Sequence, residues 1–261
     1  MSDITNPQTS ANPVLILLHG ATSNGHMWDP VRRYLDAGYR ILTPDLPGHG
    51  KRRDEPYTLD GAVATVVATA RSVAPAPVIL IGDSLGGYTS IASASALPQE
   101  QLVGLVIGGA SFNFVGSEVW PYVFKGAMFR VMSSLFGEQK LIKNTIFKEL
   151  GPGKVGISHD DIQAMLDGGM SVRVFGQCVA ALRGVDFQSK VAAITQPMLF
   201  VNGDQDKPNV RHEASFLAVA KNATVERFDC EHGVSIRRTP EFAKLVNEFA
   251  HRVTRSRAVA A

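Results

Sequence analysis

A serine stands between two glycines where a strongly apolar run ends. The segment VILIGDSLGG covers residues 78–87, and Ser84 lies between Gly82 and Gly86. Two residues without Cβ atoms allow a strand and the following helix to approach closely, so this spacing permits an abrupt strand-to-helix turn. A serine on such a turn is held exposed in a strained backbone conformation. The pattern predicts a nucleophile at Ser84, although the pentapeptide on its own is also compatible with a simple turn.

A serine hydroxyl is a weak nucleophile, so a base and an orienting carboxylate must accompany it. The last strand-like run, residues 224–230, is followed by His232, which can act as the base. The preceding run, residues 198–204, leads into VNGDQDKP and offers both Asp204 and Asp206. Serine, then aspartate, then histidine is the chain order of one hydrolase architecture. We therefore expect a catalytic triad whose acid is one of these two aspartates.

The first apolar run, residues 14–20, leads into LLHGAT and supplies a further part of the site. His19 and Gly20 are expected to open a tight loop in which the backbone N–H of Ala21 faces the nucleophile. The N–H of Leu85, at the start of the next helix, would join it in an oxyanion hole. Each such donor is worth about 3–4 kcal/mol to the transition state. We expect the imidazole of His19 to brace this loop rather than to take part in the chemistry.

Six apolar runs of strand length position these residues. Most are continuously apolar, which is typical of strands covered on both faces of a parallel sheet. Helix-like segments alternate with them, so we predict an α/β fold with a mostly parallel central sheet of about six strands flanked by helices. Ligands of such sheets bind at the carboxyl ends of the strands, where the candidate residues lie. The expected strands cover residues 14–20, 40–46, 78–84, 102–109, 198–204 and 224–230, and the expected helices cover 27–37, 58–74, 86–97, 209–220 and 240–253.

The interval between the fourth and fifth strands, residues 112–190, breaks this alternation. Its apolar residues recur at the i, i+3, i+4 spacing of helices, so we predict a helical cap inserted after the fourth strand. The glycine-rich stretch GPGKVG, residues 151–156, is expected to separate two cap helices. The alternative is that these helices simply pack beside the sheet. The core would comprise residues 1–111 and 191–261, with flexible ends at 1–12 and 255–261.

The composition excludes several classes of protein. The 261 residues include 26 Lys and Arg against 24 Asp and Glu, and the basic residues alternate with acids, so no nucleic-acid partner is expected. The two cysteines form neither a C-x-x-C motif nor a disulfide framework. The first residues lack a secretory pattern, and no window of about 18 residues is free of charge. We expect a cytoplasmic protein without a membrane span, of unknown oligomeric state.

The quoted stretches together resemble the α/β-hydrolase superfamily, of the serine hydrolase or esterase type. The resemblance rests on LILLHGATSNGHMW, ILTPDLPGHG, ILIGDSLGGYTS, ITQPMLFVNGDQDKP, CEHGVSIRRTPEF and FAKLVNEFAHRV. It implies Ser84 as the nucleophile, His232 as the base and Asp206 as the acid, because family members place the acid three residues after the strand's glycine. Asp204 would then be a loop residue. The resemblance implies no metal and no organic cofactor.

The expected reaction is hydrolysis of an ester-type bond through an acyl-enzyme on Ser84. The bond would be a carboxylic ester, lactone or thioester of a small apolar molecule, and this molecule is the expected partner. The alternatives are a lyase that uses the triad as acid and base, such as a hydroxynitrile lyase, and a ligand receptor with slow turnover. Apolar side chains of the cap could enclose the substrate or form the cap's own core. The predicted pocket residues are Trp28, Trp120, Phe124, Met128 and Met132.

Overall fold

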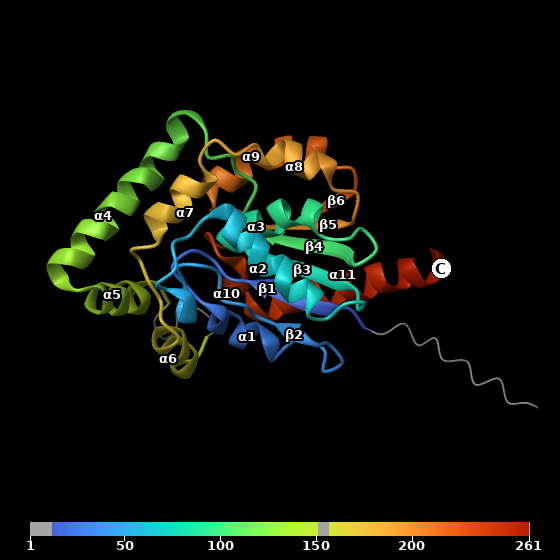
Figure 1. Cartoon of the computed structure of the whole chain (residues 1–261), viewed down its shortest axis with the longest axis horizontal. Helices are drawn as coiled ribbons and strands as arrows, with labels where there is room; N and C mark the ends of the chain where they lie inside the picture. Colours follow the sequence, from blue (N-terminus) through green and yellow to red (C-terminus); the bar gives the residue numbers. More distant parts are fainter. Residues whose placement is uncertain (1–11, 151–156, 261) are drawn as a thin grey trace, which may run out of the picture.

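A computed structural model of the chain, which describes residues 12–150 and 157–260, contains one sheet of parallel strands (Figure 1). The strand order in the sheet is β2-β1-β3-β4-β5-β6, and the predicted fold class is confirmed. The predicted glycine-rich separator, residues 151–156, lies outside the described residues. The strands are β1 Val14–Leu18, β2 Ile41–Leu42, β3 Val78–Asp83, β4 Leu102–Gly108, β5 Met198–Gly203 and β6 Ala223–Phe228.

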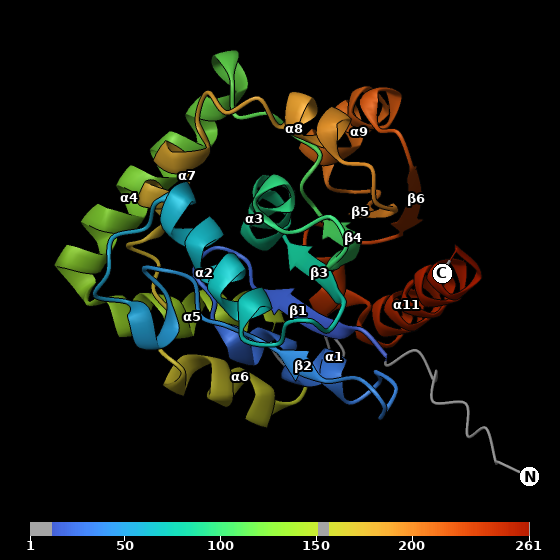
Figure 2. The ribbon, with the colours of Figure 1, turned by 45° about the vertical axis from the view of Figure 1, so that its right-hand side comes forward.

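The central strands are apolar throughout because helices cover both faces of the sheet (Figure 2). In β1, Ile16 and Leu18 belong to the core on one face, whereas Leu15 and Leu17 belong to the core on the other. The first face packs against α2, α3, α8 and α9, and the second against α1 and α11. These helices are α1 Asp29–Arg32, α2 Leu59–Arg71, α3 Leu85–Ser93, α8 Phe187–Ala193, α9 Lys207–Val219 and α11 Thr239–Ala260.

Two predicted elements are shorter than expected because tertiary hydrogen bonds replace regular ones. The helix expected over 27–37 is a short 3-10 turn followed by α1, and beyond it Asn247 of α11 bonds to the backbone of Tyr34 and Asp36. The strand expected over 40–46 is only β2, because the following loop folds back toward β1. The last helix, in contrast, is longer than expected: it continues beyond the expected end at residue 253 to Ala260.

The insert between β4 and β5 begins with four helices that lie together beyond one end of the sheet (Figure 1). These helices are α4 Trp120–Phe136, α5 Glu138–Leu150, α6 His159–Asp167 and α7 Phe175–Leu182. α4 and α7 cross closely at Gly126, where an added Cβ would lie 2.8 Å from the Cα of Gly176. α8, the fifth helix of the insert, packs on the sheet's core through Phe187 and Val191, and the predicted cap boundary at residue 190 falls inside it. No helix in the described part of the chain is long and apolar enough to cross a membrane.

Candidate active site

Ser84 occupies a sharp turn between β3 and α3. Its backbone has a φ of +55° and a ψ of −115°. Residues other than glycine rarely adopt this conformation, which costs about 1–3 kcal/mol. The flanking glycines are required by packing: an added Cβ on Gly82 would lie 2.2 Å from the carbonyl of Gly86, and one on Gly86 would lie 1.9 Å from the carbonyl oxygen of Leu18. The Ser84 N–H donates to the carbonyl of Gly108 at 2.7 Å, which fixes the turn to β4. The turn therefore presents the hydroxyl at the carboxyl end of the sheet.

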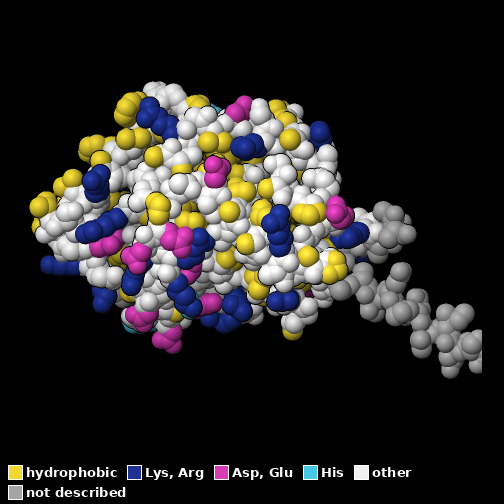
Figure 3. All heavy atoms as spheres, in the orientation of Figure 1, with side chains coloured by type: hydrophobic (Ala, Val, Ile, Leu, Met, Phe, Trp, Pro, Cys, Tyr) yellow, Lys and Arg dark blue, Asp and Glu magenta, His cyan; other side chains and the backbone are white. Residues whose placement is uncertain are grey.

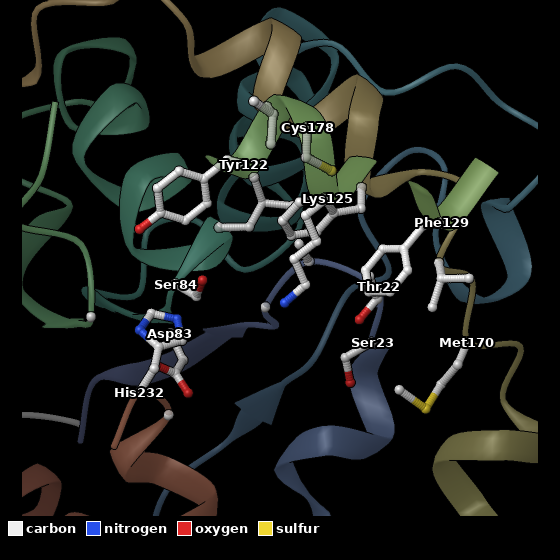
Figure 4. Close-up of a pocket in the computed structure, with 18 of the residues that line it drawn as sticks. Thr22, Ser23, Asp83, Ser84, Tyr122, Lys125, Phe129, Met170, Cys178 and His232 are labelled. Carbon is white, nitrogen blue, oxygen red and sulfur yellow. The ribbon is translucent and has the colours of Figure 1, made fainter. Parts of the chain in front are cut away.

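His232 and Asp206 follow β6 and β5 and meet at the same end of the sheet. The imidazole Nδ1 lies 2.5 Å from Asp206 Oδ2. A carboxylate only accepts hydrogen bonds, so Nδ1 carries the proton and Nε2 is left free to accept one. Asp206 Oδ2 also accepts from Asn209 Nδ2 at 2.8 Å, which holds the buried carboxylate in place. Ser84 and His232 line one cavity and lie close together in Figure 4.

Asp204 has a different environment from that of Asp206. Its side chain is 51% exposed, and its Oδ1 lies 3.9 Å from Arg227 Nη1. The geometry thus favours Asp206 as the partner of the histidine, as the sequence resemblance implies. His212 lies apart from this pair, because its Nε2 contacts Glu118 Oε2 at 2.8 Å.

The charges around His232 set its affinity for a proton. Burial on its own would lower the pKa of His232, but the hydrogen bond that its Nδ1–H donates to Asp206 and the negative charges of Asp206 and Asp83 raise that pKa above its usual value. The positive charge of Lys125 opposes this increase. The imidazole is thus a stronger base than a free histidine, and it becomes protonated at a higher pH.

One of the two predicted backbone donors, Ala21, lies in the loop after β1, and the other, Leu85, begins α3. Ser23 N–H donates to the Gly20 carbonyl at 3.3 Å, which closes a turn, and Thr22 in this turn has a φ of +71°. Within the described ranges, Thr22 and Ser84 are the two non-glycine residues with positive φ. Neither the Ala21 N–H nor the Leu85 N–H donates to a protein acceptor among these residues, and both residues line the cavity. Two free donors beside a serine on such a turn fit an oxyanion hole.

Two buried histidines hold the loop from behind. His19 Nε2 accepts from the Leu46 N–H at 3.1 Å, and His49 Nε2 accepts from the Thr22 N–H at 3.2 Å. Each Nδ1 faces a carbonyl oxygen, that of Gly20 for His19 and that of Pro47 for His49. Burial lowers the pKa of both rings, that of His49 to about 3. They are therefore neutral and position the loop, a role of His49 that the sequence analysis did not find.

Asp83, directly before Ser84, is buried at the cavity near His232. Its Oδ2 accepts a short hydrogen bond from the Ser235 hydroxyl, whereas its Oδ1 has no hydrogen-bond partner in the described chain. Burial, more than any other cause, raises the pKa of this carboxyl. The proximity of Asp83 to the imidazole adds a second negative field to that of Asp206.

A cavity of about 870 Å³ joins these groups to the cap. Of the predicted pocket residues, Met128 and Met132 line it, and Trp28, Trp120 and Phe124 do not. Trp28 is buried under the sheet against Phe242, with ring centroids 6.0 Å apart. Trp120 and Phe124 lie on the exposed side of α4, where Phe124 is 73% accessible. This corrects the predicted lining: α4 is apolar on two sides, so its hydrophobic spacing did not indicate which side faces the core.

The cavity side of α4 includes residues that the sequence analysis missed. They are Tyr122, Lys125 and Phe129, and together with the predicted Met132 they follow helical spacing. The sequence feature that could have indicated them is Lys125, a single lysine on an otherwise apolar side of the predicted helix. No group of three or more His, Cys, Asp or Glu side chains in the described ranges could hold a metal ion.

Comparison with known proteins identifies the class. Residues 15–245 match the alpha/beta hydrolase family. The pimeloyl-[acyl-carrier protein] methyl ester esterase of Stenotrophomonas maltophilia is 27% identical over 82% of this chain and 84% of that protein. MenH from S. aureus has a TM-score of 0.75 at 16% identity, over 94% of this chain and 96% of that one. The esterase EaEST from Exiguobacterium antarcticum has a TM-score of 0.72 at 19% identity, over 93% of both chains.

The chain belongs to the α/β-hydrolase family. The predictions of the fold, of the family and of a hydrolytic enzyme on this fold are confirmed.

Proposed function

We propose that the protein hydrolyses carboxylic esters through an acyl-enzyme on Ser84, with His232 as the base and Asp206 as the acid. The observation that carries this proposal is the juxtaposition of Ser84, on its strained turn, with the His232–Asp206 pair in one cavity. The name of the 27% identical relative, a methyl ester esterase, supports an ester as the substrate.

In the first half-reaction, His232 Nε2 takes the hydroxyl proton of Ser84 as Oγ forms a bond to the ester carbonyl carbon. The carbonyl oxygen becomes negative and accepts hydrogen bonds from the Ala21 and Leu85 N–H groups. As the intermediate collapses, the carbon–oxygen bond to the alcohol breaks, and His232 gives its proton to the leaving oxygen. Asp206 keeps the imidazole in the required tautomer and stabilises its positive charge.

In the second half-reaction, His232 removes a proton from water, whose oxygen attacks the acyl carbon. Collapse breaks the bond to Ser84 Oγ, which regains a proton from His232, and the carboxylic acid leaves. Every step uses groups of the chain and water. The walls beyond the triad are mostly apolar, including Phe112, Phe114 and Leu182, and they suit a hydrocarbon acyl chain.

The test is labelling with a fluorophosphonate, followed by turnover of methyl and p-nitrophenyl esters. We expect one label per chain, on Ser84. In Ser84→Ala we expect both the label and the ester turnover to be lost. Ser23→Ala is the matched control, because that hydroxyl lines the same cavity without a hydrogen-bond partner in the described chain. It should keep the label.

Two outcomes would contradict the proposal. If the wild-type protein were labelled at a residue other than Ser84, the assignment of Ser84 as the nucleophile would be wrong. Labelling of Ser84 without turnover of any ester would favour the lyase or the receptor instead.

A further inference from the structure

The cavity holds a charged side chain that the proposed mechanism does not use. Lys125 projects from α4, and its ammonium group points down into the cavity toward the level of Ser84 and Thr22 (Figure 4). Its Nζ lies 5.4 Å from the ring centroids of both Phe129 and Phe175. Both rings lie within cation–π range of the ammonium group and help to hold it in the cavity.

The other charged side chains that line the cavity have partners. Asp83 bonds to Ser235, and Asp206 bonds to His232 and Asn209. Arg237 pairs with Glu231 at 2.7 Å. Lys125 forms neither an ion pair nor a side-chain hydrogen bond with any described residue, and among the charged lining residues this is true of Lys125 alone. An unpaired cation at an apolar wall can bind an anion that enters with the ligand.

We propose that Lys125 binds a carboxylate that the substrate carries away from its ester group. The preferred substrates are therefore half-esters of dicarboxylic acids, in which an apolar chain separates the ester at Ser84 from the carboxylate at Nζ. The carboxylate subsite rests on the proposed ester hydrolysis at Ser84, and it specifies which class of ester is preferred.

The charge at the subsite favours a carboxylate over a phosphate. A single ammonium group balances one negative charge, and no second unpaired cation lines the described part of the cavity. A phosphate monoester carries up to two negative charges near neutral pH and would leave one unbalanced. The mostly apolar lining of the cavity suits the methylene chain of such a diacid.

The test compares monomethyl esters of dicarboxylic acids with the matching dimethyl esters, over a series of chain lengths. In Lys125→Met the ratio of kcat/KM for the half-ester to that for the diester should fall roughly 10- to 100-fold, as expected for the loss of one charge-assisted hydrogen bond. The loss should lie mainly in KM. Lys125→Arg should retain most of the ratio, and Lys140→Met, which removes the same charge from the neighbouring helix α5 outside the cavity, should leave it unchanged.

A binding measurement makes the test independent of turnover. Ser84→Ala should bind a monomethyl dicarboxylate by calorimetry, and the double variant with Lys125→Met should bind it about 10-fold more weakly or worse. An unchanged ratio and unchanged binding in Lys125→Met would overturn the inference, even if Ser84 labels and neutral esters are hydrolysed. Tighter binding of an alkyl phosphate than of the matching carboxylate would also overturn it. Carboxylate binding that depends on Lys125 would support the inference even if no ester were turned over.

Discussion

The carboxylate that holds His232 controls both the tautomer and the pKa of the base. Its replacement in Asp206→Asn keeps the shape but removes the negative charge, so the imidazole loses its orientation and the stabilisation of its protonated form. We expect kcat/KM for a neutral ester to fall about 10³-fold or more. Since His232 must be neutral to act, and Asp206 raises its pKa, the acid limb of the remaining activity should move to lower pH.

Asp204→Asn is the matched control, because it makes the same chemical change two residues away on a half-exposed side chain. It should change kcat/KM less than about 2-fold. A large loss in Asp204→Asn with a small one in Asp206→Asn would show that the acid has been assigned wrongly. Full pH–rate profiles of all three proteins make the comparison.

The three residues of the proposed triad could be selected from the sequence because each follows a strand end that the sequence marks. Ser84 lies between glycines that the turn requires, and the acid and base follow the fifth and sixth strands in order. The position of Lys125 in the cavity could not be predicted in this way, because it depends on which side of α4 faces the cavity. The contact between His49 and Thr22 could not be predicted either, because the two residues are 27 positions apart in the sequence.

Among the elements, α4 shows how far a hydrophobic pattern can mislead. It carries apolar residues on its cavity side and on its outer side, and hydrophobic side chains gather at the edge of the molecule where α4 lies (Figure 3). The β-strands of the core gave no such ambiguity, because both of their faces are buried. The length of β2 was overestimated because the chain after it folds back toward β1, where the Leu46 N–H donates to His19 Nε2 instead of continuing the strand.

Two phenylalanines of α4 test its orientation. Phe129→Ala removes a buried ring that lines the cavity and packs at 5.6 Å from the Phe175 ring, so we expect a loss of about 3 kcal/mol in the free energy of unfolding. It should also raise KM for esters. Phe124→Ala, the same change five residues earlier on the exposed side, should alter stability by less than about 0.5 kcal/mol and leave KM unchanged.

Urea unfolding and steady-state kinetics on both variants decide the point. A rise in KM in Phe124→Ala that matches the rise in Phe129→Ala would mean that the outer side of α4 contacts the substrate. In that case the sequence-based assignment of Phe124 to the pocket would be correct, and the orientation described here would be wrong.

At the scale of the whole molecule, the cap must stay fixed on the core for the cavity to keep its shape. One polar connection joins α6 of the cap to the end of α1 of the core, where Arg33 Nη1 and Nη2 donate to Asp161 at 2.9 and 2.6 Å. Asp161 also completes a capping box with Ser158, so one buried carboxylate starts the helix and attaches it. Glu138 makes a second connection, within the cap, to the backbone N–H of Val172.

The pKa of Asp161 turns the cap–core connection into a prediction about pH. Hydrogen bonds from Arg33 and then from Ser158 outweigh burial and lower the pKa of this carboxyl to about 2, against about 3.9 in an unfolded chain. Because the pKa is lowered, the stabilisation of the folded state is fully present at pH values above the pKa of the unfolded chain, and it disappears as the pH falls toward 2.

Because Arg33 is 53% exposed, we expect Asp161→Asn to cost about 1–2 kcal/mol near neutral pH rather than the full value of the shift. The difference from wild type in urea unfolding should shrink steadily between about pH 4 and pH 2. Asp160→Asn, the same change on the exposed neighbour in the same helix turn, should cost much less at neutral pH. Equal stability of the two variants at neutral pH would mean that the Arg33–Asp161 pair does not hold the cap.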